Sequence, residues 1–87
     1  MKIKEGFILR KVGKQYVVAA TGEASKFFNG MIRLNDVGAR MFELLQADAT
    51  AEILVSAMIA EYGADEATAK ADIELFLSKL EEAGALV

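Results

Sequence analysis

The sequence contains neither cysteine nor histidine. Without cysteine there is no disulfide and no thiolate metal site, and without histidine there is no imidazole for a catalytic triad or a metal centre. The remaining candidates for acid–base chemistry are adjacent carboxylates, Asp65–Glu66 and Glu81–Glu82. Both pairs fall at predicted helix ends, where solvated side chains are the usual finding. We therefore expect a chain that is not an enzyme and that holds no metal or cofactor.

Long apolar runs are also missing. No segment approaches the roughly 20 consecutive apolar residues of a membrane span. The opening residues 1–5 carry positive charge, but the apolar run of a signal peptide does not follow. The glycines are widely spaced, as in turns and helix caps, and form no phosphate-binding loop. These absences predict a cytoplasmic protein without a membrane partner.

The composition is that of a small folded domain. The chain has 87 residues, 54% of them apolar, and a net charge of −3, which predicts a single domain over residues 1–87 with a modest core. The charge is uneven. Eight basic residues face three acidic ones up to Arg40, and two basic face ten acidic ones after it. This distribution indicates a bipolar surface, although a solvated surface with no special partner would have the same composition.

Turn and cap residues divide the chain into three strands and three helices. The strands are expected at residues 6–12, 15–20 and about 29–35, with a hairpin turn at Gly13-Lys14 and a loop over 21–26 that Phe27 and Phe28 anchor. The helices are expected at about 36–46, 51–62 and 66–83, because their ends carry suitable N-caps and glycines. The expected caps are Asn35 or Asp36, Thr50, Asp65, Gly63 and Gly84.

Strands segregated from helices give the α+β class: a three-stranded antiparallel sheet followed by three helices, which is also the content of a winged helix-turn-helix. Apolar residues at helical spacing predict the buried faces of the last two helices, and Leu86 and Val87 are expected to fold back on the core. For residues 51–62 the predicted face is Ile53, Leu54, Ala57, Met58 and Tyr62, and for residues 66–83 it is Ala69, Ile73, Phe76, Leu77, Leu80 and Ala83.

The third strand is the most informative segment. Met31, Ile32 and Leu34 are apolar and only Arg33 interrupts them, a pattern typical of a strand that is buried on both faces or covered by another element. As the last strand of a small sheet it leaves an edge open, and an open apolar edge is a place where a peptide can add a further strand. An ordinary short strand, covered by its own chain, fits the same residues.

The third helix is a candidate wall for such a peptide site. It offers Leu75 and Phe76 as apolar contacts and Asp72 and Lys79 as charged ones, and Arg33 on the strand is a candidate partner for Asp72. An exposed pair of this kind contributes only ~0–1 kcal/mol. The alternatives without a ligand are that Phe76 belongs to the core and that the charged residues form a solvated face.

Two other binding roles remain open. A winged helix that reads DNA needs a basic recognition helix. Residues 51–62 contain no basic residue and the next helix begins with Asp65 and Glu66, so we expect no nucleic-acid partner and keep DNA binding only as an alternative. The other alternative is a homodimer in which two copies pair their third strands.

Several segments resemble the PqqD-like family, named for a small protein of pyrroloquinoline quinone biosynthesis. They are Gly6–Arg10, Phe28–Asn35 followed by Gly38, Ala69–Leu77 and Leu80–Leu86. The resemblance implies a winged-helix-like, stand-alone module that binds the leader of a ribosomally made precursor peptide as an added strand, and presents it to a modifying enzyme, often a radical S-adenosylmethionine maturase. On this chain the implied peptide-binding residues are Met31, Ile32, Arg33, Leu34, Asp72, Leu75, Phe76 and Lys79. The product of the pathway, whether pyrroloquinoline quinone or another peptide, is not implied.

Overall fold

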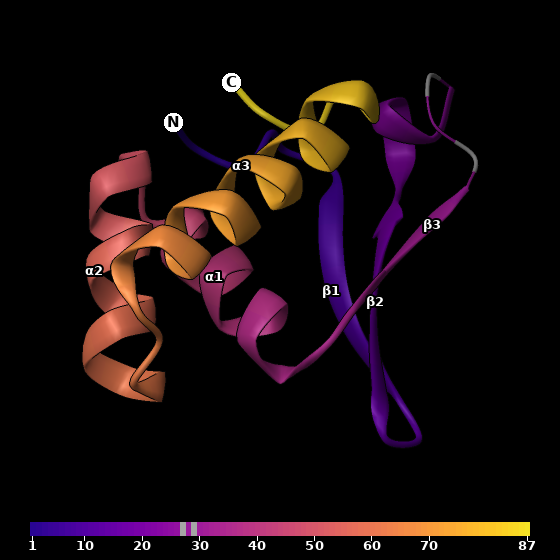
Figure 1. Cartoon of the computed structure of the whole chain (residues 1–87). Coiled ribbons are helices and arrows are strands. Elements are labelled where there is room, and N and C mark those ends of the chain that lie inside the picture. The colour runs from indigo at the N-terminus through magenta and orange to yellow at the C-terminus, as the bar shows by residue number, and fades with distance from the viewer. Residues whose placement is uncertain (27, 29) are drawn as a thin grey trace.

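The computed structural model describes residues 1–26, 28 and 30–87. In chain order the elements are β1 (Phe7–Val12), β2 (Gln15–Ala20), a short 3₁₀ helix η1 (Gly22–Lys26), β3 (Met31–Leu34), α1 (Asp36–Gln46), α2 (Ala51–Tyr62) and α3 (Glu66–Glu82). The strands form an antiparallel sheet in the order β1-β2-β3, and the helices gather on one side of it (Figure 1). The predicted α+β class, with three strands followed by three helices, is confirmed.

The β1–β2 hairpin fixes the register of the sheet. Its two-residue turn has Gly13 at a positive φ of 63°, a backbone conformation that glycine adopts without strain and that two-residue hairpins require. At the other end, the amide of Thr21 donates to the carbonyl of Gly6 over 2.7 Å. Between these points Phe7 pairs with Ala20 and Val12 with Gln15, so the register is continuous along both strands.

The core lies between the inner face of the sheet and the three helices. Phe7 and Val18 from the sheet are buried there, and half-buried Leu9, Ala20, Ile32 and Leu34 pack beside them. The helices contribute a larger buried group: Met41, Phe42, Leu45, Leu54, Met58, Ile73 and Leu80. Burial of this apolar surface is the main stabilising contribution, at about 25 cal/mol for each Å² removed from water.

The helix caps follow the predicted residues. Asn35, rather than Asp36, caps α1; Thr50 caps α2 and accepts from the amide of Ile53, and Asp65 caps α3. Gly63 ends α2 at a φ of 69°. Capping side chains satisfy the amides that the first turn of a helix leaves without partners, so each helix begins at a defined residue.

Some expectations about burial are wrong. Ile53 is 49% exposed and Tyr62 is exposed as well, whereas Leu54 and Met58 are buried. Since α2 has apolar residues on nearly all its faces, the sequence pattern could not select the buried one.

Two other expectations also differ from the structure. The segment 21–26, expected as a loop, contains η1, and Val87, expected to fold back on the core, is exposed. Phe28 is half-buried, with its ring centroid 5.9 Å from that of Phe7, while Phe27 and Asn29 lie outside the described residues.

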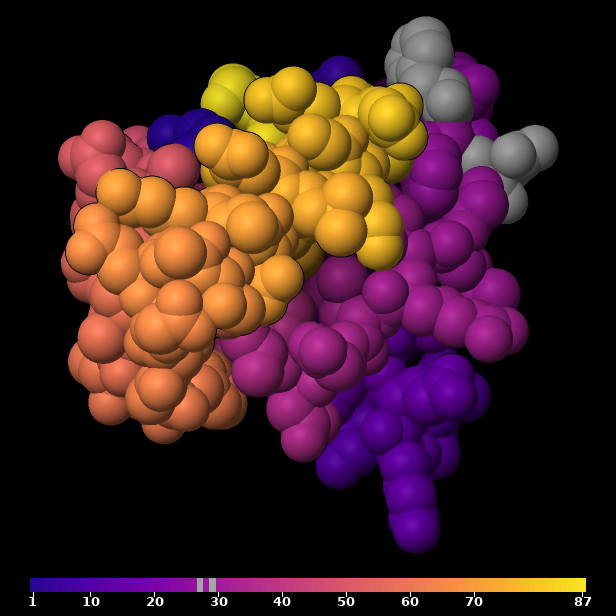
Figure 2. All heavy atoms as spheres, in the orientation of Figure 1, coloured from indigo at the N-terminus to yellow at the C-terminus, as the bar shows by residue number. Residues whose placement is uncertain are grey.

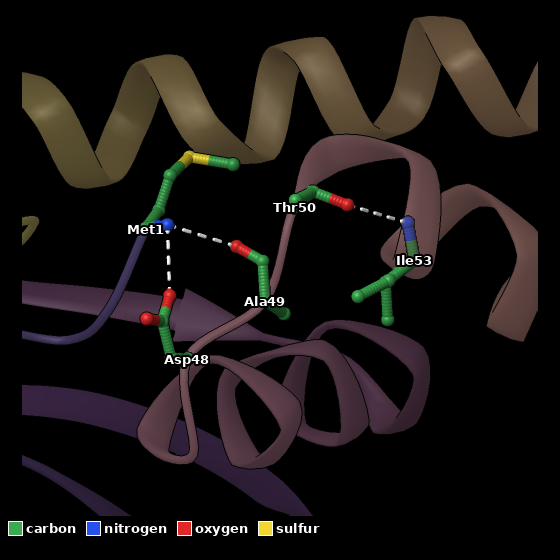
Figure 3. Close-up of polar contacts among 5 residues, drawn as sticks. All are labelled: Met1, Asp48, Ala49, Thr50 and Ile53. Carbon is green, nitrogen blue, oxygen red and sulfur yellow. Dashed lines mark hydrogen bonds and ion pairs between the residues drawn. The ribbon is translucent and has the colours of Figure 1, made fainter.

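The two ends of the chain meet beside the helices. Ile3 forms a bridge with Leu86, and the amide of Val87 donates to the carbonyl of Lys2 over 2.8 Å. The ammonium of Met1 donates to the carboxylate of Asp48 and to the carbonyl of Ala49, 3.0 Å away in each case (Figure 3). These contacts hold the first residues against the α1–α2 connection.

In the part of the chain that the structure describes, every helix is too short or too polar to cross a lipid bilayer.

Candidate functional site

The outer edge of β3 presents backbone groups to solvent. In an antiparallel sheet, hydrogen-bonded and non-hydrogen-bonded pairs alternate. The two-residue turn at Gly13 makes Val12 and Gln15 a hydrogen-bonded pair. The hydrogen bond from the amide of Thr21 to the carbonyl of Gly6 fits the same alternation along the two strands. On β2 the groups directed at β3 therefore belong to Tyr16 and Val18, whose partners are Leu34 and Ile32. The amides and carbonyls of Met31 and Arg33 consequently point to the free edge, with which no described residue pairs.

The side chains of β3 alternate in burial. Ile32 and Leu34 face the helices and are half-buried, whereas Met31 is 67% exposed and Arg33 is exposed on the opposite face. Of the alternatives that the sequence left open, burial on both faces does not apply, and the helices cover the inner face alone. Since no described element covers the outer face of the sheet, only every second residue of the run contributes to the core.

A hollow of about 300 Å³ lies between the end of β3 and the middle of α3. Its floor is made by Met41, Met58 and Ile73, all of which are buried. Leu34 lines it from the strand side and Phe76 from the helix side. Such a concave apolar surface is suited to a side chain that leaves water on binding.

A second hollow, of about 540 Å³, continues along the strand towards the start of β3. Ile32 and Met31 line it from β3, Phe28 from the segment before β3, and Ala83 from the end of α3. Both hollows are lined by Arg33 and by Lys79, so they are adjacent. We call the two together the β3–α3 groove, and Figure 2 shows the surface recessed between the magenta strand and the orange-to-yellow helix.

The eight predicted peptide-binding residues all line this groove. Met31 and Ile32 belong to the second hollow, Leu34, Asp72, Leu75 and Phe76 to the first, and Arg33 and Lys79 to both. The structure thus brings together two segments that are almost forty residues apart in sequence.

Local structure at the β3–α1 junction shapes the first hollow. The cap residue Asn35 follows Leu34 directly, and its side chain accepts from the amide of Gly38. A Cβ atom at Gly38 would lie 3.2 Å from the Cβ of Leu34 and 3.4 Å from the side-chain oxygen of Asn35. Glycine at this position therefore lets the first turn of α1 approach the end of the edge strand closely.

The opposite wall is the face of α3 that carries Asp72, Leu75, Phe76 and Lys79. These positions follow the spacing of three and four residues that places side chains on one side of a helix. Leu75 is 60% exposed although it is a large apolar residue. An exposed leucine beside an apolar hollow and an open strand edge is a candidate contact for a binding partner.

The charges around the groove are mixed. Arg33 and Lys79 are basic, Asp72 lines the first hollow, and Glu82 lines the second. Arg33 and Asp72 are both described, and no ion pair joins them, so the pair considered from the sequence does not form. None of these four groove charges forms an ion pair with a described residue, so each is available to a ligand.

The groups with shifted pKa values lie outside the groove. Glu61 raises the pKa of Arg40 through a hydrogen-bonded ion pair, and Glu66 does the same for Lys70. The pKa of Asp48 is lowered by the ammonium of Met1, and that of Asp65 by its hydrogen bond to Thr68 at the start of α3. These shifts belong to surface ion pairs and to a helix cap.

Sequence reasoning missed the floor of the groove. Val37, Met41 and Met58 line the first hollow, and Phe28 and Glu82 line the second. Met41 and Met58 carry the signal of core residues, and only the packing of α1 and α2 against α3 shows that they also reach a concave surface. Phe28 was predicted to anchor a loop, and the sequence gives no sign that it also lines the groove.

Comparison with known proteins identifies the family. The model of coenzyme PQQ synthesis protein D (PqqD) matches residues 9–86. The chain belongs to the PqqD family. No curated protein sequence matches the chain.

Two solved structures of PqqD-like fold are similar over nearly the whole chain. TbiB1, in complex with the TbiA(beta) leader peptide, is 27% identical with a TM-score of 0.76, over 99% of this chain and 94% of that one. Lasso peptide synthetase B1, complexed with the leader peptide, is 18% identical with a TM-score of 0.73, over 97% of this chain and 93% of that one. The second likeness concerns the fold alone.

Proposed function

We propose that this protein binds the leader segment of a ribosomally made precursor peptide as a fourth strand on β3 and presents the peptide to a modifying enzyme. The observation that carries the proposal is the free edge of β3 beside an apolar groove. The backbone groups of Met31 and Arg33 supply hydrogen bonds that any peptide can use, and the two hollows select among side chains.

Family membership and the relatives support a peptide as the ligand. TbiB1 is solved with a leader peptide, shares 27% of its residues with this chain and covers almost all of it. The PqqD family model spans residues 9–86, which include β3, α3 and every groove residue. A role in binding, without catalysis by this chain, fits a site built mainly from apolar side chains and strand-edge backbone, with charged residues around it.

The finer parts of the proposal concern the partners. We infer that the modifying enzyme is a radical S-adenosylmethionine maturase, because that enzyme class often works with PqqD-like modules, and that the encounter takes place in the cytoplasm. The groove residues Met31, Ile32, Arg33, Leu34, Asp72, Leu75, Phe76 and Lys79 are the proposed peptide contacts. A short precursor gene and a maturase gene beside this one would support the assignment.

The test is a calorimetric titration with leaders encoded by short reading frames next to this gene. We expect one of them to bind, and a proline inside its pairing segment to weaken binding at least about tenfold, because proline lacks the amide that a strand ladder uses. Affinity that is insensitive to proline at every position of the leader would argue against strand addition.

The free edge also suits a second copy of the chain, so a homodimer through β3 is the alternative function. One edge cannot pair with two strands at once. Light scattering of the protein with and without the leader separates the cases: a dimer that the leader dissociates supports pairing of the two β3 strands in the free protein. DNA binding has less support, since α2 contains no basic residue and α3 begins with Glu66.

A further inference from the structure

Arg33 occupies a distinctive place on the outer face of the sheet. The register places Arg10, Val17 and Arg33 in one row across the three strands. Val17 is only 7% exposed although it lies on the face away from the helices. Among the described residues, neither Arg10 nor Arg33 has an ion-pair partner. The row therefore carries uncompensated positive charge up to the free edge.

An added strand would place one of its residues beside Arg33 on this outer face. The backbone groups of Arg33 point to the free edge, so a strand that pairs there bonds to them directly. Side chains alternate between the two faces of a sheet, and neighbours across the ladder share a face. The leader residue paired with Arg33 therefore points outward with the arginine, and the residues before and after it point towards the helices. This holds for either direction of the leader, because the alternation belongs to every strand.

The two inward residues would meet the two hollows. The first hollow lies beside Leu34 and the second beside Ile32, the residues that flank Arg33 and face the helices. Arg33 lines both hollows and so marks the boundary between them. A side chain in the first hollow lies over buried Met41 and Ile73, and one in the second lies against Phe28 and Ile32. Apolar residues are favoured in both places.

We propose that the pairing segment of the leader contains an apolar–acidic–apolar triplet. Its acidic residue lies opposite Arg33 and its apolar residues enter the two hollows. This inference rests on the proposed function. Arg33 is then the residue that sets the register and the charge preference of the leader. An aspartate or glutamate opposite Arg33 gains a cross-strand ion pair, and a lysine or arginine there is repelled.

The alternation of the strand strengthens this choice of register. A slip of the leader by one residue would turn its acidic side chain away from Arg33 and into one of the hollows. Each hollow has both a carboxylate, Asp72 or Glu82, and Lys79 in its lining, so the acidic side chain gains no clear new attraction there. The slipped complex would lose the ion pair with Arg33 and would turn both apolar side chains out of the hollows, so the triplet specifies one register.

The test uses a display library of short random peptides, selected on the purified protein, on R33E and on K14E. Lys14 is exposed in the hairpin turn and is not part of the groove, so K14E makes the same change of charge elsewhere. We expect wild type and K14E to enrich peptides with aspartate or glutamate between two apolar residues, and R33E to enrich lysine or arginine at that middle position. Thermal unfolding of the variants shows that each is folded.

A second measurement uses the tightest wild-type binder as the probe. Replacing its middle acidic residue by lysine should weaken binding to wild type about tenfold, because the change removes a cross-strand attraction and adds a cross-strand repulsion, and it should improve binding to R33E. Enriched peptides without the triplet, or the same preference on R33E as on wild type, would overturn this inference and leave strand addition in place. If no selected peptide is sensitive to a proline in its pairing segment, both this inference and the proposed function are wrong.

Discussion

The side chain of Asn35 accepts a hydrogen bond from the amide of Gly38, with 2.8 Å between the two atoms. This contact joins the end of β3 to the first turn of α1. Leu34, which lines the first hollow, immediately precedes the cap, and Gly38 leaves room for it. A single turn therefore fixes where the free edge ends and how the groove begins.

The first prediction concerns this cap. Asn35→Ala should lower the free energy of unfolding by about 1 kcal/mol, because the amide of Gly38 loses its acceptor. Asn35→Asp keeps an acceptor at the same place and should unfold close to wild type. Urea denaturation of the three proteins measures the difference. Equal loss in the alanine and aspartate variants would show that the side-chain hydrogen bond does not stabilise the helix start.

The second prediction concerns Gly6, which precedes β1 at a φ of 99°. An added Cβ would lie 2.8 Å from the Cβ of Ala24 and 3.0 Å from the carbonyl oxygen of Thr21. Gly6→Ala should therefore destabilise the fold by about 2 kcal/mol or more, from backbone strain and overlap together.

Gly22→Ala is the matched control for Gly6→Ala. Gly22 also has a positive φ, 57°, but an added Cβ there meets no atom within 4 Å. Gly22→Ala should destabilise the fold by about 1 kcal/mol, the contribution of backbone strain alone. Thermal unfolding of the two variants checks that Gly6→Ala is the less stable one. A Gly6 variant that is as stable as the Gly22 variant would contradict the close approach of η1 to the start of β1.

The third prediction concerns pH. The ammonium of Met1 lowers the pKa of Asp48, so the folded state holds this proton more weakly than the unfolded chain. The resulting stabilisation is fully present above the unfolded pKa of about 3.9 and is lost as the pH falls through the lower folded value.

Asp48→Asn tests the direction of this pH dependence. Asparagine is the suitable replacement because it also tolerates the positive φ of 71° at position 48. The variant should be less stable than wild type at neutral pH, and the difference should shrink as the pH falls below about 4. Urea unfolding at several pH values gives the two curves. A constant difference across that range would mean that the ion pair does not contribute to the pH dependence.

The fourth prediction separates binding from folding on α3. Leu75→Glu should leave stability within about 0.5 kcal/mol of wild type, because the side chain is exposed, yet weaken leader binding about tenfold or more by placing a charge in an apolar contact. Ile53→Glu introduces the same charge at an exposed apolar position of α2, outside the groove. It should bind as wild type does. Equal weakening by both variants would indicate a charge effect unrelated to the groove.

Much of the fold could be predicted because local signals agreed with each other. Thr50, Asp65 and Gly63 mark helix ends by hydrogen-bonding and backbone rules that act within a few residues. Gly13 marks the hairpin in the same way. These rules need no knowledge of the tertiary packing, and the predicted strands and α-helices and their order are therefore confirmed.

The remaining features depend on packing between distant segments. Ile53 and Leu54 are adjacent and equally apolar, and only the position of α1 and α3 decides that Leu54 is the buried one. Met31 and Ile32 differ in the same manner, since the helices cover only one face of the sheet. The walls of the groove were predicted from the open edge and the family resemblance. Its floor, with Met41 and Met58, was not predicted, because a core pattern does not tell which core residues reach a surface.

The most direct test of strand addition compares Arg33→Pro with Arg33→Ala in a leader titration. The amide of Arg33 points to the free edge, so a proline there keeps the bonds between β2 and β3 and removes one donor that the leader needs. The account predicts that the proline variant is folded and binds the leader about tenfold more weakly than the alanine variant. Equal affinity of two folded variants would contradict the claim that the leader pairs with β3.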